Sequence, residues 1–415
     1  MTGRVSRWMV SILLRRIRIG GLVVVEDGAR RVYGAGAPTA TVYLHCPGVW
    51  AMLLRGSRGL AEAYAQGLWD SPDLVALIRL AARNAAGLDR LRARLAPVRW
   101  PLQRAAGLLA PGTQRRARRD IAAHYDLGNE LFARMLDSTL SYSCAIFACP
   151  GMTLEQAQVA KLERVCEKLA LGAQDRVIEI GSGWGAFALY AASTRGCHVT
   201  TTTISQEQYA YVCERVRDAG CQSKVTVLMD DYRELRGRYD KLVSIEMIEA
   251  VGWRQLGAFL AQCSRLLAAD GAMLLQAITI DDRAYEVEKA SKSFINTYVF
   301  PGGCLPSLAV ITRELARRTD LQTADLEDLT PHYVQTLRRW RANFTAHTAT
   351  LADLGYDERF QRIWTLYLAY CEAGFAERRI SDIQLVLTKP RSRLTTAERP
   401  PSRDRISPHD LAASA

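Results

Sequence analysis

The glycine-rich segment at residues 177–185 is the stretch whose residue types and spacing most directly indicate chemistry. Its sequence, VIEIGSGWG, is an apolar run that breaks into three glycines spaced GxGxG. A buried parallel strand has such an apolar run, and glycine permits a tight turn and a close approach of the backbone to a ligand. Helix-compatible residues follow at 187–192. We therefore expect the loop to join a strand to a helix N-terminus, where doubly wound sheets bind nucleotide-like cofactors.

The glycine spacing distinguishes between kinds of cofactor site. It is not GxGxxG, and no GK[ST] follows, so neither the dinucleotide fingerprint nor the phosphate-binding loop is present. An acid at the strand end, Glu179, followed by GxGxG resembles the S-adenosylmethionine loop of class I methyltransferases. The alternative is an ordinary glycine-rich turn between a strand and a helix.

The elements around this loop must present it at one edge of a sheet. Strand-like and helix-like segments alternate after about residue 121, and the strand-like ones are 177–181, 198–204, 224–229, 240–247, 272–280 and 383–390. This alternation predicts an α/β fold with a parallel, Rossmann-like sheet and helices on both faces. Hydroxyl and amide side chains at 201–208, and the acids Asp230 and Asp231, follow two of the strands. They are predicted to lie at the edge where such sheets bind ligands.

The chain divides by composition into four parts. Residues 1–82 contain short strand-like runs and an amphipathic segment, as in a small α+β domain. Residues 83–120, rich in arginine, alanine and leucine, are predicted to form a basic helical linker. Residues 121–390 form the predicted α/β domain, and the polar, proline-rich end at 391–415 is predicted to be disordered.

Composition and charge limit the classes of partner. With 415 residues, 49% of them hydrophobic, the chain can bury a sizeable core, and no apolar run approaches the roughly 18–20 residues that span a bilayer. Ten cysteines without a CxxC pair argue against a zinc site or disulfides and indicate a reducing cytoplasm. The net charge of +11 predicts an anionic partner. Without an RNA-binding signature, a phospholipid surface fits better than nucleic acid, and a solvated basic linker is the alternative.

Six separated segments carry a resemblance to a known family. They are EIGSGWG, AYAQGLWDSPDL and the stretches 122–147, 243–252, 296–307 and 331–340. From about residue 45 to residue 390 the chain closely resembles the cyclopropane fatty acyl phospholipid synthase family. The resemblance implies a class I methyltransferase fold with an antiparallel last strand, and an N-terminal lipid-binding domain. It also implies S-adenosylmethionine as methyl donor and an unsaturated phospholipid acyl chain as acceptor. The enzyme would be cytoplasmic and peripheral on the inner face of the membrane, and a homodimer is compatible with the resemblance.

The resemblance also implies how a base is held. In the family a bicarbonate ion removes a proton, and the matching residues here are Cys144, through its backbone, Glu249, Ile278 and Tyr333. Where the family usually has a histidine, this chain has Gln276, whose amide can donate a hydrogen bond to an anion but cannot relay a proton. We therefore expect Glu249 to be required for turnover.

Further residues are expected to contact the cofactor and the substrate. The cofactor set is Tyr142, Ser143, Glu179, Gly181, Ser182, Gly183, Gly185, Thr203, Ser205, Gln206, Gln208 and Asp231. Within this set Asp231 is expected to bind the adenine amino group. Tyr298 and Phe300 are expected to close an apolar acyl channel, and no metal site is predicted.

Two departures from the family leave the reaction product open. Ala250 stands in place of the histidine in the family's EHVG, and Gln276 in place of a later histidine. Loss of a proton directly from the new methyl group closes a cyclopropane, whereas a preceding hydride shift leaves an exocyclic methylene. The motifs EAVG and QAIT resemble those of the family branch that makes 10-methylene or 10-methyl stearoyl chains more closely than those of the cyclopropane-forming branch. The rival hypotheses are a methyltransferase for a small non-lipid acceptor and a lipid-binding protein with altered catalysis.

Overall fold

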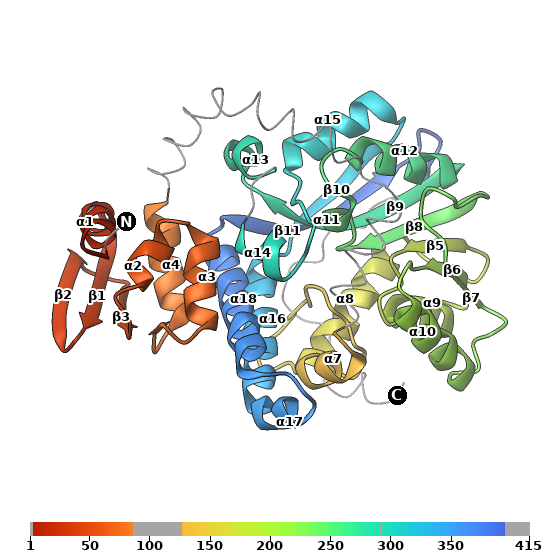
Figure 1. Ribbon diagram of the computed structural model, residues 1–415. Helices are drawn as coiled ribbons and strands as arrows, with labels where there is room; N and C mark the ends of the chain where they lie inside the picture. The colour runs from red at the N-terminus through yellow and green to blue at the C-terminus, as the bar shows by residue number, and fades with distance from the viewer. Residues whose placement is uncertain (1–2, 86–126, 290–292, 395–415) are drawn as a thin grey trace.

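The computed structural model describes residues 3–85, 127–289 and 293–394, which form a small N-terminal domain and a larger α/β domain (Figure 1). Most of the predicted basic linker and most of the predicted disordered tail lie outside the described residues. None of the helices in the described parts is long and apolar enough to cross a membrane.

The N-terminal domain is a four-stranded mixed sheet with helices packed against it. Its strand order is β2-β1-β3-β4, with β1 antiparallel to β2 and parallel to β3. Leu22, Val24 and Trp50 are buried in its core, and the Trp50 indole donates a hydrogen bond to Glu26 at 2.7 Å. The elements are α1 (Gly3–Leu14), β1 (Gly20–Glu26), β2 (Ala29–Ala35), β3 (Thr39–Leu44), α2 (Val49–Leu53), α3 (Ser57–Ala65), β4 (Trp69–Asp70) and α4 (Leu74–Asn84).

The α/β domain is built on a seven-stranded sheet of order β10-β11-β9-β8-β5-β6-β7. Its strands are β5 (Arg176–Ile180), β6 (His198–Thr202), β7 (Val225–Leu228), β8 (Tyr239–Ile245), β9 (Leu267–Ile280), β10 (Gln322–Asp328) and β11 (Ile380–Thr388). The strands from β9 to β7 run parallel, whereas β11 is antiparallel to both β9 and β10, which confirms the predicted sheet with an antiparallel last strand. The sequence does not predict β10, because its polar, mostly exposed residues lack the apolar alternation of a half-buried strand.

Helices cover both faces of this sheet (Figure 1). α8, α9 and α10 pack on one face against Val177 and Val199, and α12 and α15 pack on the other against Ile178 and Leu242. Because residues alternate between the two faces of a strand, a strand buried on both faces is continuously apolar, as the sequence at 177–180 is apart from Glu179. The helices are α7 (Asn129–Met135), α8 (Leu154–Lys168), α9 (Ala186–Arg195), α10 (Gln206–Asp218), α11 (Ile248–Val251), α12 (Leu256–Leu266), α13 (Asp282–Glu288), α14 (Phe294–Tyr298), α15 (Leu308–Arg318), α16 (Thr330–Ala346), α17 (Thr348–Asp353) and α18 (Glu358–Ala376).

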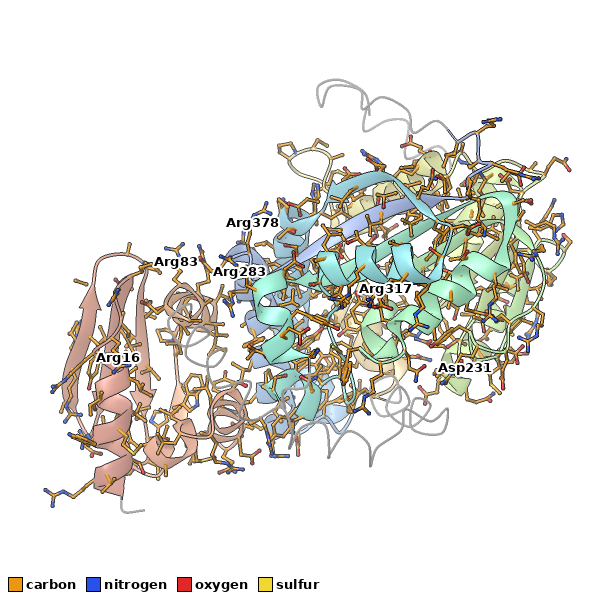
Figure 2. All side chains as sticks on the ribbon, turned by 90° about the horizontal axis from the view of Figure 1, so that it is seen from above. Arg16, Arg83, Asp231, Arg283, Arg317 and Arg378 are labelled. Atoms are coloured by element: carbon orange, nitrogen blue, oxygen red, sulfur yellow. The ribbon has the colours of Figure 1, made fainter. Side chains whose placement is uncertain are left out.

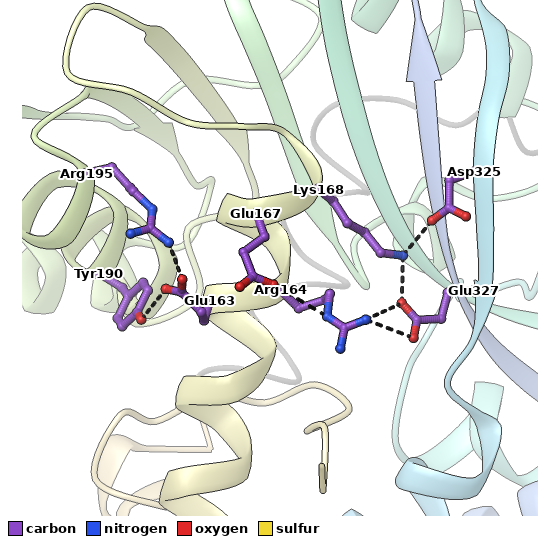
Figure 3. Close-up of polar contacts among 8 residues, drawn as sticks. All are labelled: Glu163, Arg164, Glu167, Lys168, Tyr190, Arg195, Asp325 and Glu327. Carbon is purple, nitrogen blue, oxygen red and sulfur yellow. Dashed lines mark hydrogen bonds and ion pairs between the residues drawn. The ribbon is translucent and has the colours of Figure 1, made fainter. Parts of the chain in front are cut away.

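Charged side chains of α8 tie the edge strand β10 to helix α9 (Figure 3). Lys168 pairs with Asp325 at 2.9 Å and with Glu327 at 2.8 Å, both on β10. Glu163, further back on α8, pairs with Arg195 of α9. The network therefore fixes α8, which carries a buried lysine of the site described below.

Helix α18 joins the two domains, because it packs against α3 and α4 on one side and against α16 on the other (Figure 1). Its Arg362 donates hydrogen bonds to the carbonyl oxygens of Tyr64 at 2.6 Å and Trp69 at 3.0 Å, and to the Asp70 carboxylate at 2.7 Å. The guanidinium carbon also lies 4.1 Å from the centroid of the Tyr64 ring. These contacts set the position of the N-terminal domain relative to the sheet.

Replacing Arg362 with alanine should loosen this junction. The change removes a donor from two carbonyl oxygens and from Asp70, so we expect the free energy of unfolding to fall by about 2 kcal/mol. Arg359→Ala is the matched control: Arg359 lies on the same helix, is 53% exposed and pairs with Glu62. A pair at the surface contributes at most about 1 kcal/mol. Urea unfolding followed by circular dichroism measures both variants, and equal losses would contradict the role assigned to Arg362.

Candidate active site

The predicted glycine loop lies between β5 and α9, as expected. Gly181, Gly183 and Gly185 have φ values of 98°, 50° and 87°, in the left-handed region that favours glycine. The N–H groups of Gly181 and Ser182 donate to the Thr202 carbonyl on the neighbouring strand at 3.0 and 2.9 Å. A Cβ built on Gly183 would meet no other atom of the described residues within 4 Å. The sheet thus holds the loop on one side, and open space for a ligand remains at Gly183.

Polar side chains at the ends of β5 and β6 bind one another beside this loop. Thr201 donates to Glu179 at 2.6 Å, and Thr203 donates to the Gln208 side chain at 2.8 Å. Ser205 caps α10 by accepting a hydrogen bond from the N–H of Gln208 at 3.3 Å. Burial raises the pKa of Glu179 to about 8, although its hydrogen bond from Thr201 opposes the rise.

Two members of the predicted cofactor set are placed differently. Gln206 is exposed on the first turn of α10. Asp231 is buried, and its two carboxylate oxygens accept hydrogen bonds from Arg233 at 2.6 to 3.0 Å. The loop, the strand-end hydroxyls and this acid still share the carboxyl edge of the parallel strands, which fits a bound S-adenosylmethionine.

A half-buried acid outside the predicted set, Glu246, lies at the centre of the site. Its Oε1 accepts hydrogen bonds from the backbone N–H of Cys144 at 2.7 Å and from the Gln276 side-chain amide at 2.8 Å. Its Oε2 accepts one from the Tyr333 hydroxyl at 2.5 Å. Three residues that were expected to hold a bicarbonate ion therefore hold the carboxylate of Glu246.

The backbone of Glu246 is also unusual. Its φ of 48° falls in the left-handed region, which residues other than glycine rarely adopt. Such strain costs of order 1–3 kcal/mol and gathers at functional sites. In the sequence, the signal for this residue is a lone acid directly after the apolar strand end LVSI, at the ligand edge of the sheet.

Glu249 and Ile278, which were also expected to hold the anion, bind each other. Glu249 Oε1 accepts a hydrogen bond from the backbone N–H of Ile278 at 2.5 Å. Its Oε2 is buried and has no hydrogen-bond partner among the described residues. Burial, followed by the neighbouring charge of Glu246, raises the pKa of Glu249 to about 8. This environment favours a protonated Glu249 at neutral pH.

Two further buried ionisable groups border Glu246. Asp382 Oδ2 accepts a hydrogen bond from Gln276 at 3.1 Å, and burial together with the two glutamates raises the pKa of Asp382 well above its ordinary value. Lys161 of α8 donates to the Ser143 hydroxyl at 2.8 Å; burial lowers its pKa, and Glu246 opposes that effect. Lys161 thus places a positive charge near Glu246 and Asp382. Glu246 accepts three hydrogen bonds, which favour its ionised form and oppose the rise in pKa that its enclosure causes.

A cavity of about 710 Å³ connects this carboxylate with the core of the N-terminal domain. Near Glu246 its walls include Tyr142 and Tyr367, whose hydroxyl oxygens lie 2.7 Å apart. Farther from Glu246 its walls are apolar, with the side chains of Leu22, Val24, Leu44, Trp50, Trp69 and Leu80. The cavity therefore crosses the junction of the two domains.

The two residues expected to close an acyl channel differ in position. Phe300 lines the cavity and packs edge-on against Tyr367, with ring centroids 5.8 Å apart. Tyr298 is not among the described residues that line the cavity; its hydroxyl donates to Glu62 of α3 at 2.5 Å. Tyr298 therefore contributes to the domain junction, a contact that short-range sequence patterns do not indicate.

The sheet topology and the glycine loop at its carboxyl edge are those of a class I S-adenosylmethionine-dependent methyltransferase. Residues 113–385 match the family model described as mycolic acid cyclopropane synthetase. The chain belongs to the mycolic acid cyclopropane synthetase family, and the predicted family resemblance is confirmed.

Relatives match over most of their length. The chain is 38% identical over 364 residues to tuberculostearic acid methyltransferase UfaA1 of Mycobacterium tuberculosis, covering 85% of this chain and 84% of that protein. It is 36% identical over 360 residues to cyclopropane-fatty-acyl-phospholipid synthase of Escherichia coli, covering 85% and 89%. Among solved structures, mycolic acid cyclopropane synthase CmaA1, complexed with SAH and CTAB, matches with 30% identity and a TM-score of 0.61, covering 66% of this chain and 98% of that one.

Replacing Gly183 with alanine should impair cofactor binding. A side chain at φ 50° is strained, and the added methyl group would enter the space left for the ligand. We expect the affinity for S-adenosylmethionine, measured by isothermal titration calorimetry, to fall about tenfold or more. Gly220→Ala is the control, because Gly220 has a φ of 65° and equally open surroundings but follows the far end of α10. Equal losses of affinity in the two variants would contradict this placement of the cofactor.

Proposed function

We propose that this protein transfers a methyl group from S-adenosylmethionine to the double bond of unsaturated acyl chains in membrane phospholipids. The observation that carries the proposal is the largely apolar cavity that reaches Glu246, because it can hold an acyl chain away from water beside a base. The similarity to the Escherichia coli synthase supports a phospholipid acceptor. The enzyme would act at the cytoplasmic face of the membrane as a peripheral protein.

S-adenosylmethionine, when bound, supplies the methyl group from its sulfonium sulfur. The proposed contacts to it are the glycine loop, Glu179, the hydroxyl-rich end of β6 and the Tyr142–Ser143 segment, which directly precedes Cys144, a donor to Glu246. As a new bond forms between the methyl carbon and one alkene carbon, the other alkene carbon becomes positive. The rings of Tyr142 and Tyr367 border this part of the cavity, and aromatic faces stabilise cations.

We infer that Glu246 acts as the base, in the position where a bicarbonate ion was expected. Its carboxylate takes a proton from the transferred methyl carbon, and the electron pair of that C–H bond forms the new carbon–carbon bond of the product. The donors Cys144, Gln276 and Tyr333 hold the carboxylate at a fixed place. With a carboxylate already among these donors, the proposed reaction needs no bicarbonate.

The proposed direct product is a chain with an exocyclic methylene branch, which a separate hydride-donating reductase would have to reduce to give a methyl branch; the cyclopropane is the alternative. A hydride shift before deprotonation gives the exocyclic methylene, and direct deprotonation gives the ring. Gln276, Ala250 and the similarity to a tuberculostearic acid methyltransferase support the branched outcome. Gas chromatography with mass detection of lipids from a host rich in oleoyl chains distinguishes the two products. A small polar acceptor is disfavoured, because the apolar cavity wall offers it few partners.

Glu246→Gln should abolish most turnover, whereas Glu249→Gln should not. The first change removes the proposed base, which typically accounts for a factor of about 10² to 10⁴ in rate. The second replaces a carboxyl group that the site already keeps neutral with a neutral amide, so we expect a loss of less than about tenfold. Formation of S-adenosylhomocysteine on oleoyl-lipid vesicles measures both, and calorimetry checks that each variant still binds the cofactor. A larger loss of turnover in Glu249→Gln would contradict Glu246 as the base and support a bicarbonate ion held by Glu249.

The same assignment has a rescue test. Glu246→Gly removes the carboxylate and relieves the strained φ, while the three hydrogen-bond donors remain. Added bicarbonate should then restore part of the turnover of this variant and leave the unaltered protein unchanged. A variant that binds cofactor and yet responds to neither bicarbonate nor formate would argue against Glu246 as the base.

The pH dependence of turnover should report the ionisation of Glu246. Burial raises its pKa, so activity should fall with decreasing pH at a higher pH than the ordinary glutamate pKa of about 4.3 would give. The Tyr333 hydrogen bond favours the carboxylate and lowers this pKa, so Tyr333→Phe should move the acid limb of kcat to higher pH. Tyr367→Phe is the control, because that buried hydroxyl contacts Tyr142 rather than Glu246. Superimposable acid limbs for Tyr333→Phe and the unaltered protein would contradict the assignment.

A further inference from the structure

Helix α1 is apolar on its outward face, which is unusual for a helix at a protein surface. Its exposed apolar side chains, with their exposed fractions, are Val5 at 46%, Trp8 at 66%, Met9 at 40% and Leu13 at 45%. Positions three, four and eight residues apart lie on one side of a helix, so these four form one continuous strip. Ser6 and Val10, on the adjacent side of the helix, are buried against the domain.

Arginines border this apolar strip at both ends of the helix. Arg4 lies in the first turn, and Arg15, Arg16 and Arg18 follow the last; all four are exposed. Figure 2 shows Arg16 on the N-terminal domain, at the opposite end of the molecule from Asp231. An exposed apolar strip bordered by arginines is the pattern of a helix that lies in the interface of an anionic bilayer.

The same segment leads into the cavity that reaches Glu246. Leu14, the last residue of α1, and Ile17, shortly after it, are both lining residues. Leu22 of β1 and Ala81 of α4 continue the wall beside them. The helix that carries the outward apolar strip therefore ends at residues that line the cavity.

We propose that α1 docks the enzyme on the anionic surface of a phospholipid bilayer, with Val5, Trp8, Met9 and Leu13 inserted among the lipids. An acyl chain would then enter the cavity past Leu14 and Ile17. The proposal rests on the proposed function, since it supplies the route by which a membrane lipid reaches the site. Charge favours a bilayer over a second copy of the chain, because a symmetric contact through α1 would bring like-charged arginines together.

Vesicle binding by the full chain tests the docking directly. The probe is vesicles of equal parts dioleoyl phosphatidylglycerol and dioleoyl phosphatidylcholine. Combined Trp8→Ser, Met9→Ser and Leu13→Ser should weaken co-sedimentation by about tenfold or more, because apolar area is no longer buried. Val32→Ser is the matched control: Val32 is 62% exposed on β2 of the same domain, and its loss should change binding by less than about twofold. Equal effects in the two variants would overturn the docking face.

Charge and depth of insertion are tested separately. Removing one arginine beside the strip, as in Arg16→Gln, should weaken binding about fivefold at low salt and less at high salt. Vesicles with brominated acyl chains should quench part of the tryptophan fluorescence of the unaltered protein. That quenched part should be missing in Trp8→Phe, a change mild enough to keep the helix folded. Unchanged quenching in Trp8→Phe would place another tryptophan at the membrane.

Turnover measured on detergent micelles and on vesicles of the same lipid distinguishes a defect in membrane docking from a defect in catalysis. On detergent micelles the triple variant should keep its activity within about twofold, whereas on vesicles it should lose about tenfold or more. Binding to vesicles through Trp8 without conversion of lipid in either form would support docking and overturn the proposed function. Equal conversion of vesicle lipid by both proteins would support the function and overturn docking. A dimer that the triple variant loses, with vesicle binding unchanged, would show that a second copy covers α1.

Discussion

The enclosure of one carboxyl group, Glu246, at the inner end of an apolar cavity is the constraint on which the arrangement of the site depends. A carboxylate removed from water needs hydrogen-bond donors or a cation, since otherwise it takes up a proton. Here the donors come from a loop before α8, from β9 and from α16, and the cation, Lys161, comes from α8. The ion pairs that fix α8 against β10 and α9 therefore also fix the electrostatics of the site.

The cavity and the carboxylate impose opposite requirements on each other. A carbocation survives only where water is excluded, so the walls must be apolar. The same exclusion of water raises the pKa of Glu246, which makes it a stronger base but also favours its neutral form. Three hydrogen bonds to the carboxylate counter the second effect. Glu249 and Asp382 lack comparable sets of donors, and their raised pKa values let them be neutral in the same enclosure.

The sequence predicts the parts of this molecule whose cause is local. Alternating apolar segments specify the sheet, and three glycines specify the loop, because both follow from backbone requirements of neighbouring residues. The family resemblance predicts that Cys144, Gln276 and Tyr333 lie together. It does not predict that they surround Glu246. Glu246 escapes prediction because its role depends on donors that lie far away in the sequence. The sequence does not indicate the position of Tyr298 for a similar reason, since its partner Glu62 belongs to the other domain.

A base that is part of the chain has a consequence for the choice between ring and branch. A free ion can shift toward whichever proton is nearest, whereas Glu246 is anchored by its own backbone and by three donors. Those donors also lower its proton affinity relative to an unpaired buried carboxylate. Both effects delay removal of the proton from the new methyl group. The longer the cation persists, the more often a hydride shift moves the charge to the methyl-bearing carbon first. On the proposed mechanism, a well-held carboxylate thus favours the branched chain over the cyclopropane.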